Sequence, residues 1–165
     1  MSTPKTASAR PARLWKRLPA DRRLEAAIAF WQEEGDAASR AEAIDAIARH
    51  LRFRHKSVAT MPVERQARTL ASLPDPSDSL AARLLVVYHF TRHRLMMAAF
   101  LDAIGVPHEN GLIAGEDLRP PDAERCRTAA RTLQSQFPAE DVSIYLGTLL
   151  AQDPEVWGAL AELVS

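Results

Sequence analysis

Residues 78–104 have the sequence DSLAARLLVVYHFTRHRLMMAAFLDAI, in which no glycine or proline interrupts a helical apolar pattern. A straight helix of that length would be about 40 Å long. Leu80, Leu84 and Val87 lie on one side of it, and Leu85 and Phe100 lie on the opposite side. A helix that is apolar nearly all round is usually buried by neighbours on several sides. We therefore predict that this long helix is the centre of the fold.

The rest of the chain also has a helical periodicity, with helix starts near Pro19, Ser39, Pro62, Asp122 and Pro138. Residues 105–121, which include an Asn-Gly pair, are expected to form a loop. No segment alternates apolar and polar residues for long enough to predict a strand. The sequence thus predicts an all-α protein: a single compact domain of six or seven helices packed around residues 78–104. Residues 1–17 are predicted to be a flexible basic tail, and residues 18–165 to be the helical domain.

Length and composition exclude several classes of protein. A chain of 165 residues suits one domain, and its 47% hydrophobic residues argue against global disorder. A single cysteine cannot form an internal disulfide framework and fits a reducing compartment. No apolar run approaches the ~18 residues that suggest a membrane helix, and no signal-peptide pattern follows the basic amino terminus. We therefore expect a cytoplasmic protein without a membrane span.

The charges are distributed unevenly along a chain whose formal net charge is zero. Residues 1–68 carry 14 basic and 8 acidic side chains, a balance of +6, whereas residues 69–165 carry 7 and 13, a balance of −6. Opposite charges in the two halves can attract two copies head to tail or steer a charged partner. A solvated surface that is merely sorted by sign would have the same pattern.

The best candidate for a binding surface is a basic face at residues 49–68. If the second helix continues to Lys56, three of its cations form one stripe flanked by Phe53, and the following helix adds two more. The predicted face consists of Arg49, Arg52, Lys56, Arg65 and Arg68. Its partner is expected to be a protein with an acidic surface, or a second copy of this chain. Nucleic acid is a less favoured alternative, because the chain is neutral and only 6% aromatic.

His89 and His93 are one helical turn apart, so that their imidazoles can point the same way. Such a pair can contribute two ligands to a metal ion, or respond to pH because two close imidazoles resist double protonation. A third ligand would have to come from another helix, for example from His50 or His55. The simpler alternative is a pair of partly buried histidines hydrogen-bonded to backbone or carboxylate.

The other candidates for catalysis are few. Asp102 and Glu109 are carboxylates suited to acid–base chemistry, but residues in such positions usually cap a helix and shape a turn. The sequence contains no phosphate-binding loop, dinucleotide glycine pattern, nucleophile elbow or paired-cysteine spacing. We therefore predict a non-enzymatic adaptor or regulatory domain that uses the basic face and requires no cofactor. The alternatives are a metal- or small-ligand-binding protein or enzyme that uses His89 and His93, and, third, a nucleic-acid-binding protein.

Overall fold

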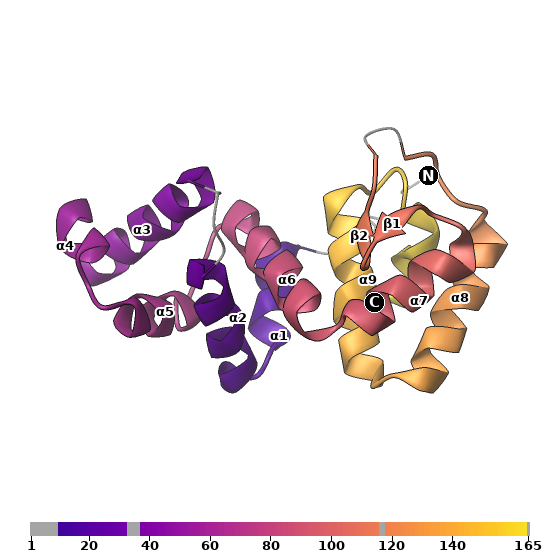
Figure 1. Cartoon of the computed structure of the whole chain (residues 1–165), viewed down its shortest axis with the longest axis horizontal. Helices are drawn as coiled ribbons and strands as arrows, with labels where there is room; N and C mark the ends of the chain where they lie inside the picture. Colours follow the sequence, from indigo (N-terminus) through magenta and orange to yellow (C-terminus); the bar gives the residue numbers. More distant parts are fainter. Residues whose placement is uncertain (1–9, 33–36, 116–117, 165) are drawn as a thin grey trace, which may run out of the picture.

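The computed structural model describes residues 10–32, 37–115 and 118–164, which are mostly helical and form two adjacent groups of helices within one compact domain (Figure 1). The first group contains α1 (Pro11–Arg17), α2 (Ala20–Gln32), α3 (Ala37–Leu51), α4 (His55–Ala59), α5 (Val63–Ala71) and α6 (Asp78–Arg92). The second contains α7 (Arg94–Ile104), β1 (His108–Glu109), β2 (Leu112–Ile113), α8 (Ala123–Gln136), α9 (Ala139–Gln152) and the 3-10 helix η1 (Gly158–Leu163). In these ranges no helix is both long and apolar enough to cross a membrane.

The first hydrophobic core lies in the group α1–α6. Phe30 and Trp31 of α2 are buried there with ring centroids 5.4 Å apart, and Leu70 of α5 and Leu84 of α6 are fully buried in the same cluster. Removing such side chains from water is the dominant stabilising contribution to folding. The predicted starts near Pro19 and Pro62 are confirmed, since α2 begins at Ala20 and α5 at Val63.

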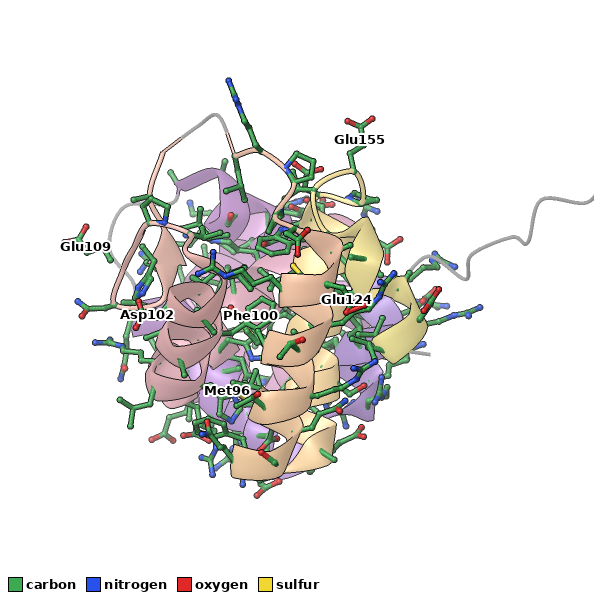
Figure 2. The ribbon with its side chains drawn as sticks, turned by 90° about the vertical axis from the view of Figure 1, so that its right-hand side faces the viewer. Met96, Phe100, Asp102, Glu109, Glu124 and Glu155 are labelled. Atoms are coloured by element: carbon green, nitrogen blue, oxygen red, sulfur yellow. The ribbon has the colours of Figure 1, made fainter. Side chains whose placement is uncertain are left out.

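The second core is enclosed by α7, α8, α9 and η1. Met96 and Phe100 lie between α7 and α8 (Figure 2), and the Phe100 ring centroid is 6.1 Å from that of Trp157. The predicted start at Asp122 is confirmed, because its Oδ2 accepts a hydrogen bond of 2.9 Å from the backbone N–H of Arg125, as an N-cap does.

The long central helix predicted for residues 78–104 is wrong, because the helix is broken at His93 (φ −123°, ψ 30°). Residue 93 separates α6 from α7, which run in different directions (Figure 1). In a continuous helix the Phe90 carbonyl would accept from the backbone N–H of Arg94. Here it accepts from the Arg94 side chain, whose Nε lies 2.8 Å away. The break lets α6 pack in the first core and α7 in the second.

The flexible tail predicted for residues 1–17 is wrong from Pro11 onward, and residues 1–9 lie outside the described ranges. Pro11–Arg17 form α1, whose Trp15 is fully buried in the first core. Arg10 and Arg17 are not free cations, because they pair with Asp78 and Glu140 at 3.3 and 3.0 Å. The apolar residues of this short segment are too few to produce a recognisable helical period.

The second helix does not continue to Lys56, as the basic stripe required. α3 ends at Leu51, and Arg52 adopts a left-handed conformation with φ 58°. The N–H of Phe53 then donates to the carbonyl of Ala48 at 2.9 Å, which is the wider bond of a Schellman motif. Lys56 therefore belongs to a separate helix, α4. The additional helices α1, α4 and α7 explain why the prediction of six or seven was too low.

The predicted loop at residues 105–121 contains a small β-hairpin, and the all-α class is otherwise correct. β1 and β2 are antiparallel and pair Glu109 with Leu112. The turn residues Asn110 and Gly111 have φ of 53° and 90°, as a two-residue type I′ turn requires. A Cβ at Gly111 would lie 2.7 Å from that of Met97, so that this position allows the hairpin to lie directly against α7.

Candidate functional site

The predicted basic residues are all exposed, but they do not form one stripe. Arg49 turns toward the start of α6, whereas Arg68 lines a small hollow beside Arg23 and Leu24 of α2. The remaining cations lie at the end of the molecule formed by the carboxyl end of α3, by α4 and by the start of α5 (Figure 1). We call this surface, together with Arg68, the basic end, and it consists of Arg52, Phe53, Arg54, Lys56, Val63, Arg65 and Arg68.

Two large apolar side chains are exposed on the basic end. Phe53 is 42% exposed and Val63 is 55% exposed. The guanidinium carbon of Arg65 lies 5.8 Å from the centroid of the Phe53 ring, within the range of a cation–π contact. Gln66 holds α5 against α4, because its buried Nε2 donates to the carbonyl of Val58 at 2.8 Å. The sequence had indicated Phe53 but not Val63, which a helical period assigns to the interior.

The cations of the basic end differ from five others in the first group of helices. Arg10, Lys16, Arg17, Arg49 and Arg92 each form an ion pair with a carboxylate. Among the residues that the structure describes, no carboxylate forms such a pair with Arg52, Arg54, Lys56, Arg65 or Arg68. Within the described ranges, the positive charge of this surface is therefore not neutralised by ion pairs.

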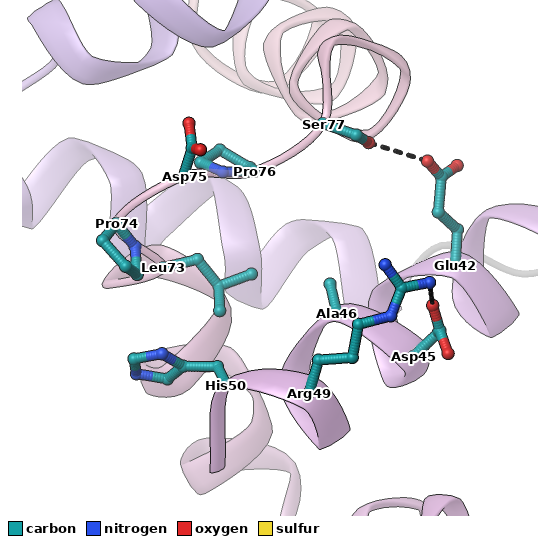
Figure 3. Close-up of a pocket in the computed structure, with 10 residues that line it drawn as sticks. All are labelled: Glu42, Asp45, Ala46, Arg49, His50, Leu73, Pro74, Asp75, Pro76 and Ser77. Atoms are coloured by element: carbon teal, nitrogen blue, oxygen red, sulfur yellow. Dashed lines mark hydrogen bonds and ion pairs between the residues drawn. The ribbon is translucent and has the colours of Figure 1, made fainter. Parts of the chain in front are cut away.

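Arg49 belongs instead to a hollow of about 490 Å³ between α3 and the segment that leads into α6 (Figure 3). Its guanidinium binds Asp45, which also accepts a hydrogen bond of 2.8 Å from Nε2 of His55. These two partners hold the pKa of Asp45 below its ordinary value, with the His55 hydrogen bond as the larger cause. Ser77 donates to Glu42 at 2.8 Å. The Ser77–Glu42 hydrogen bond thus joins the two walls of the hollow, whereas Asp45 links α3 to α4.

His89 and His93 are brought together, as predicted, at the end of α6. The Nδ1 atoms of the two rings are 3.4 Å apart, and Nε2 of His89 is 3.1 Å from Oγ1 of Thr148 on α9. The single hydroxyl proton of Thr148 is donated to the carbonyl of Ile144 at 2.8 Å, so Nε2 of His89 must be the donor to Thr148. Nδ1 of His89 therefore accepts a hydrogen bond from Nδ1 of His93.

Burial keeps His89 uncharged. Its side chain is 1% exposed, and burial together with the neighbouring His93 lowers its pKa from 6.5 to about 3. His93 is less buried, and Nε2 of its ring lies 3.6 Å from Asp141 on α9. Burial lowers the pKa of His93, the Asp141 carboxylate opposes that shift, and Arg22 on α2 adds to it. His89 is thus an uncharged ring that accepts a hydrogen bond from His93, which lies closer to the surface beside Asp141.

The third ligand needed for a metal site does not come from His50 or His55. His50 lies on α3 and lines the hollow in Figure 3, and His55 lies on α4 and contacts Asp45. In the described ranges no group of three His, Cys, Asp or Glu side chains is arranged to hold a metal ion. Asp102 is bound by His108 at 2.6 Å, and Glu109 is exposed on β1 (Figure 2).

Sequence reasoning missed the partners that α9 contributes to this cluster, namely Asp141, Tyr145 and Thr148. Tyr145 is buried, and its ring centroid is 5.4 Å from that of His89. The available signal was weak: Tyr145 and Thr148 are polar groups within the largely apolar run of residues 142–150.

Comparison with protein families, with curated proteins and with solved structures found no match. The function is therefore inferred from the residues of this chain.

Proposed function

We propose that this chain is a protein-interaction domain that binds an acidic surface of a partner protein through its basic end. The observation that supports this most directly is the set of five exposed cations without carboxylate partners among the described residues, beside the exposed ring of Phe53. Residues that dominate binding energy at protein interfaces are enriched in arginine and aromatic side chains. Unpaired cations also accelerate the encounter with an acidic surface.

A protein partner is favoured over nucleic acid by the composition of the basic end. Its one aromatic ring, Phe53, is already covered on one side by Arg65, and Val63 adds an apolar contact that phosphates do not need. Binding of single-stranded nucleic acid usually combines a basic groove with several stacking aromatics. A protein surface with carboxylates around an apolar centre complements both properties of the basic end.

The first test measures binding of a fluorescein-labelled, glutamate-rich peptide with a central tryptophan by fluorescence anisotropy at low salt. Reversing two charges in Lys56→Glu/Arg65→Glu should weaken binding about tenfold, because each lost ion pair is replaced by repulsion. Phe53→Ala should also weaken it by removing the apolar contact.

The matched control is Arg119→Glu/Arg131→Glu, which changes the net charge equally at two exposed arginines in the second group of helices. This control should bind the peptide as the original chain does. Equal losses in both double variants would show that only net charge matters and would reject the basic end as the site. Tighter binding of a DNA duplex with the same formal charge as the peptide would favour the nucleic-acid alternative. Salt-sensitive dimers in sedimentation would make a second copy the partner.

A further inference from the structure

A second candidate site is a hollow of about 170 Å³ between the first turns of α2 and the last turn of α5. The described residues that line it are Ala20, Arg23, Leu24, Arg68, Ala71 and Ser72. Pockets that enclose a whole ligand usually measure about 300–1,000 Å³, so this smaller hollow suits a single chemical group. It shares Arg68 with the basic end, and its other lining residues lie outside that surface.

Neither arginine of the hollow has a partner among the residues that the structure describes. Arg68 is exposed and Arg23 is half-buried. Three described carboxylates lie within about one helical turn of them in the sequence. Glu25 pairs with an arginine of α6 instead, and Asp21 and Glu64 form no ion pair in the described ranges. The hollow therefore carries two positive charges that no described carboxylate neutralises.

The guanidinium of Arg23 is partly removed from water without compensation. Its Nε is buried and has no hydrogen-bond partner in the described part of the chain. Its two terminal nitrogens are not buried in this way and have no partner there either, so they can donate to a group outside the protein. Partial burial of a cation without an opposite charge is costly, and a bound anion would reduce that cost.

The other residues of the hollow do not compete for an anion. Ala20, Leu24 and Ala71 have no polar side-chain atoms, and charges attract more strongly beside apolar surface than in open water. The hydroxyl of Ser72 donates to the carbonyl of Thr69 at 3.2 Å. The side-chain donors available to an anion are therefore the two guanidinium groups. Two cations without a carboxylate match a group that carries two negative charges better than a group that carries one.

We propose that this hollow binds a phosphate monoester between the guanidinium groups of Arg23 and Arg68. Near neutral pH such a group has a charge of about −1.5 to −2 and three acceptor oxygens. Guanidinium groups donate to phosphate oxygens through two parallel N–H groups, which gives both strength and a fixed geometry. The phosphate belongs either to a free small molecule or to a phosphorylated side chain of a partner, and both present the same chemistry to the hollow.

The test titrates the full chain with phenyl phosphate and with benzoate at low ionic strength in a buffer without phosphate, and NMR of each ligand measures its binding. We expect phenyl phosphate to bind about tenfold more tightly than benzoate, which has a single charge. Arg23→Gln and Arg68→Gln should each weaken phenyl phosphate binding about tenfold, as the loss of hydrogen bonds to a charged group does. Because Arg68 is exposed, its variant tests the site even if Arg23→Gln does not fold.

Arg65→Gln is the matched control, because it removes the same charge from an exposed arginine one turn earlier on α5 that does not line the hollow. It should change phenyl phosphate binding by less than about twofold, but weaken binding of the glutamate-rich peptide to the basic end. Arg23→Gln should have the opposite effects, since Arg23 is not part of the basic end. The two proteins thus distinguish failure of the hollow from failure of the basic end.

A phosphoserine version of the same peptide distinguishes the two sources of phosphate. If it binds more tightly than the unphosphorylated peptide and the gain is lost in Arg23→Gln, the phosphate belongs to a partner protein. If the two peptides bind equally while phenyl phosphate still binds, it belongs to a free molecule. The proposal is overturned if phenyl phosphate shows no saturable binding, if benzoate binds as tightly, or if Arg65→Gln weakens phenyl phosphate binding as much as Arg68→Gln does.

Discussion

The most unusual backbone conformation at the scale of single residues is that of Arg52. A left-handed φ costs an ordinary L-residue roughly 1–2 kcal/mol, and the position that ends a Schellman motif is normally glycine. Arg52 nevertheless occupies it with φ 58° and an exposed side chain. This cost is consistent with a charge required at the basic end for binding rather than for stability.

Arg52→Gly should therefore raise the free energy of unfolding by about 0.5–1 kcal/mol, because glycine adopts this conformation without strain. Urea denaturation measures the difference. Arg49→Gly, which places glycine inside α3, is the control and should lower stability by about 1 kcal/mol. A destabilised Arg52→Gly variant would contradict the interpretation of this position as strained.

The lowered pKa of His89 predicts how the stability of the protein depends on pH. Its pKa is about 3 in the folded protein and about 6.5 when unfolded, so below pH 6.5 the unfolded chain binds a proton that the folded chain does not. Stability should then fall as the pH falls, by about 2 kcal/mol between pH 7 and pH 5 from this group alone. The pKa of His93 is shifted in the same direction by burial and by Arg22, against the opposing effect of Asp141.

The measurement is the urea midpoint of the original chain and of His89→Gln at both pH values. The glutamine variant starts from a lower stability, but it should lose about 2 kcal/mol less on acidification, because it lacks the titrating group. Equal losses of stability in the two proteins between pH 7 and pH 5 would show that His89 does not cause the destabilisation by acid.

At the scale of the elements, the junction between α6 and α7 depends on Arg94. Its Nε satisfies the Phe90 carbonyl, and its guanidinium carbon lies 3.9 Å from the centroid of the Phe90 ring. Arg94→Met preserves helix propensity and much of the apolar side chain but removes both interactions. It should lower the free energy of unfolding by about 1–2 kcal/mol, measured by thermal denaturation. An unchanged melting temperature would assign the bend to core packing alone.

The elements also show which features a sequence can predict. The starts of α2, α5, α8 and α9 were predictable, because proline and aspartate act within one turn of a helix end. The break at His93 was not predictable, because no glycine or proline marks it. It occurs because the residues before it pack in the first core and the residues after it pack in the second. A cavity of about 360 Å³ that is lined in part by Tyr145 was not predictable from the sequence either. Its walls come from α6, α7, α9 and the β-hairpin, which meet only in the folded chain.

At the scale of the whole molecule, the two oppositely charged parts of the sequence become two ends of the structure. The basic end lies on α3, α4 and α5, whereas Asp102, Glu109, Glu124 and Glu155 lie on the second group and point outward (Figures 1 and 2). The charge counts were available from the sequence, but their separation in space depends on α1, α6 and α9, which keep the two groups side by side.

This separation makes the protein an electric dipole without a net charge. Near its isoelectric point of about 7.0, no overall repulsion keeps molecules apart, while their ends attract each other over distances limited by the surrounding ions. At low ionic strength, we therefore expect concentrated solutions to form transient chains and become turbid. Added salt shortens the range of the attraction and should dissolve these chains, so we expect solubility to rise at first as salt is added.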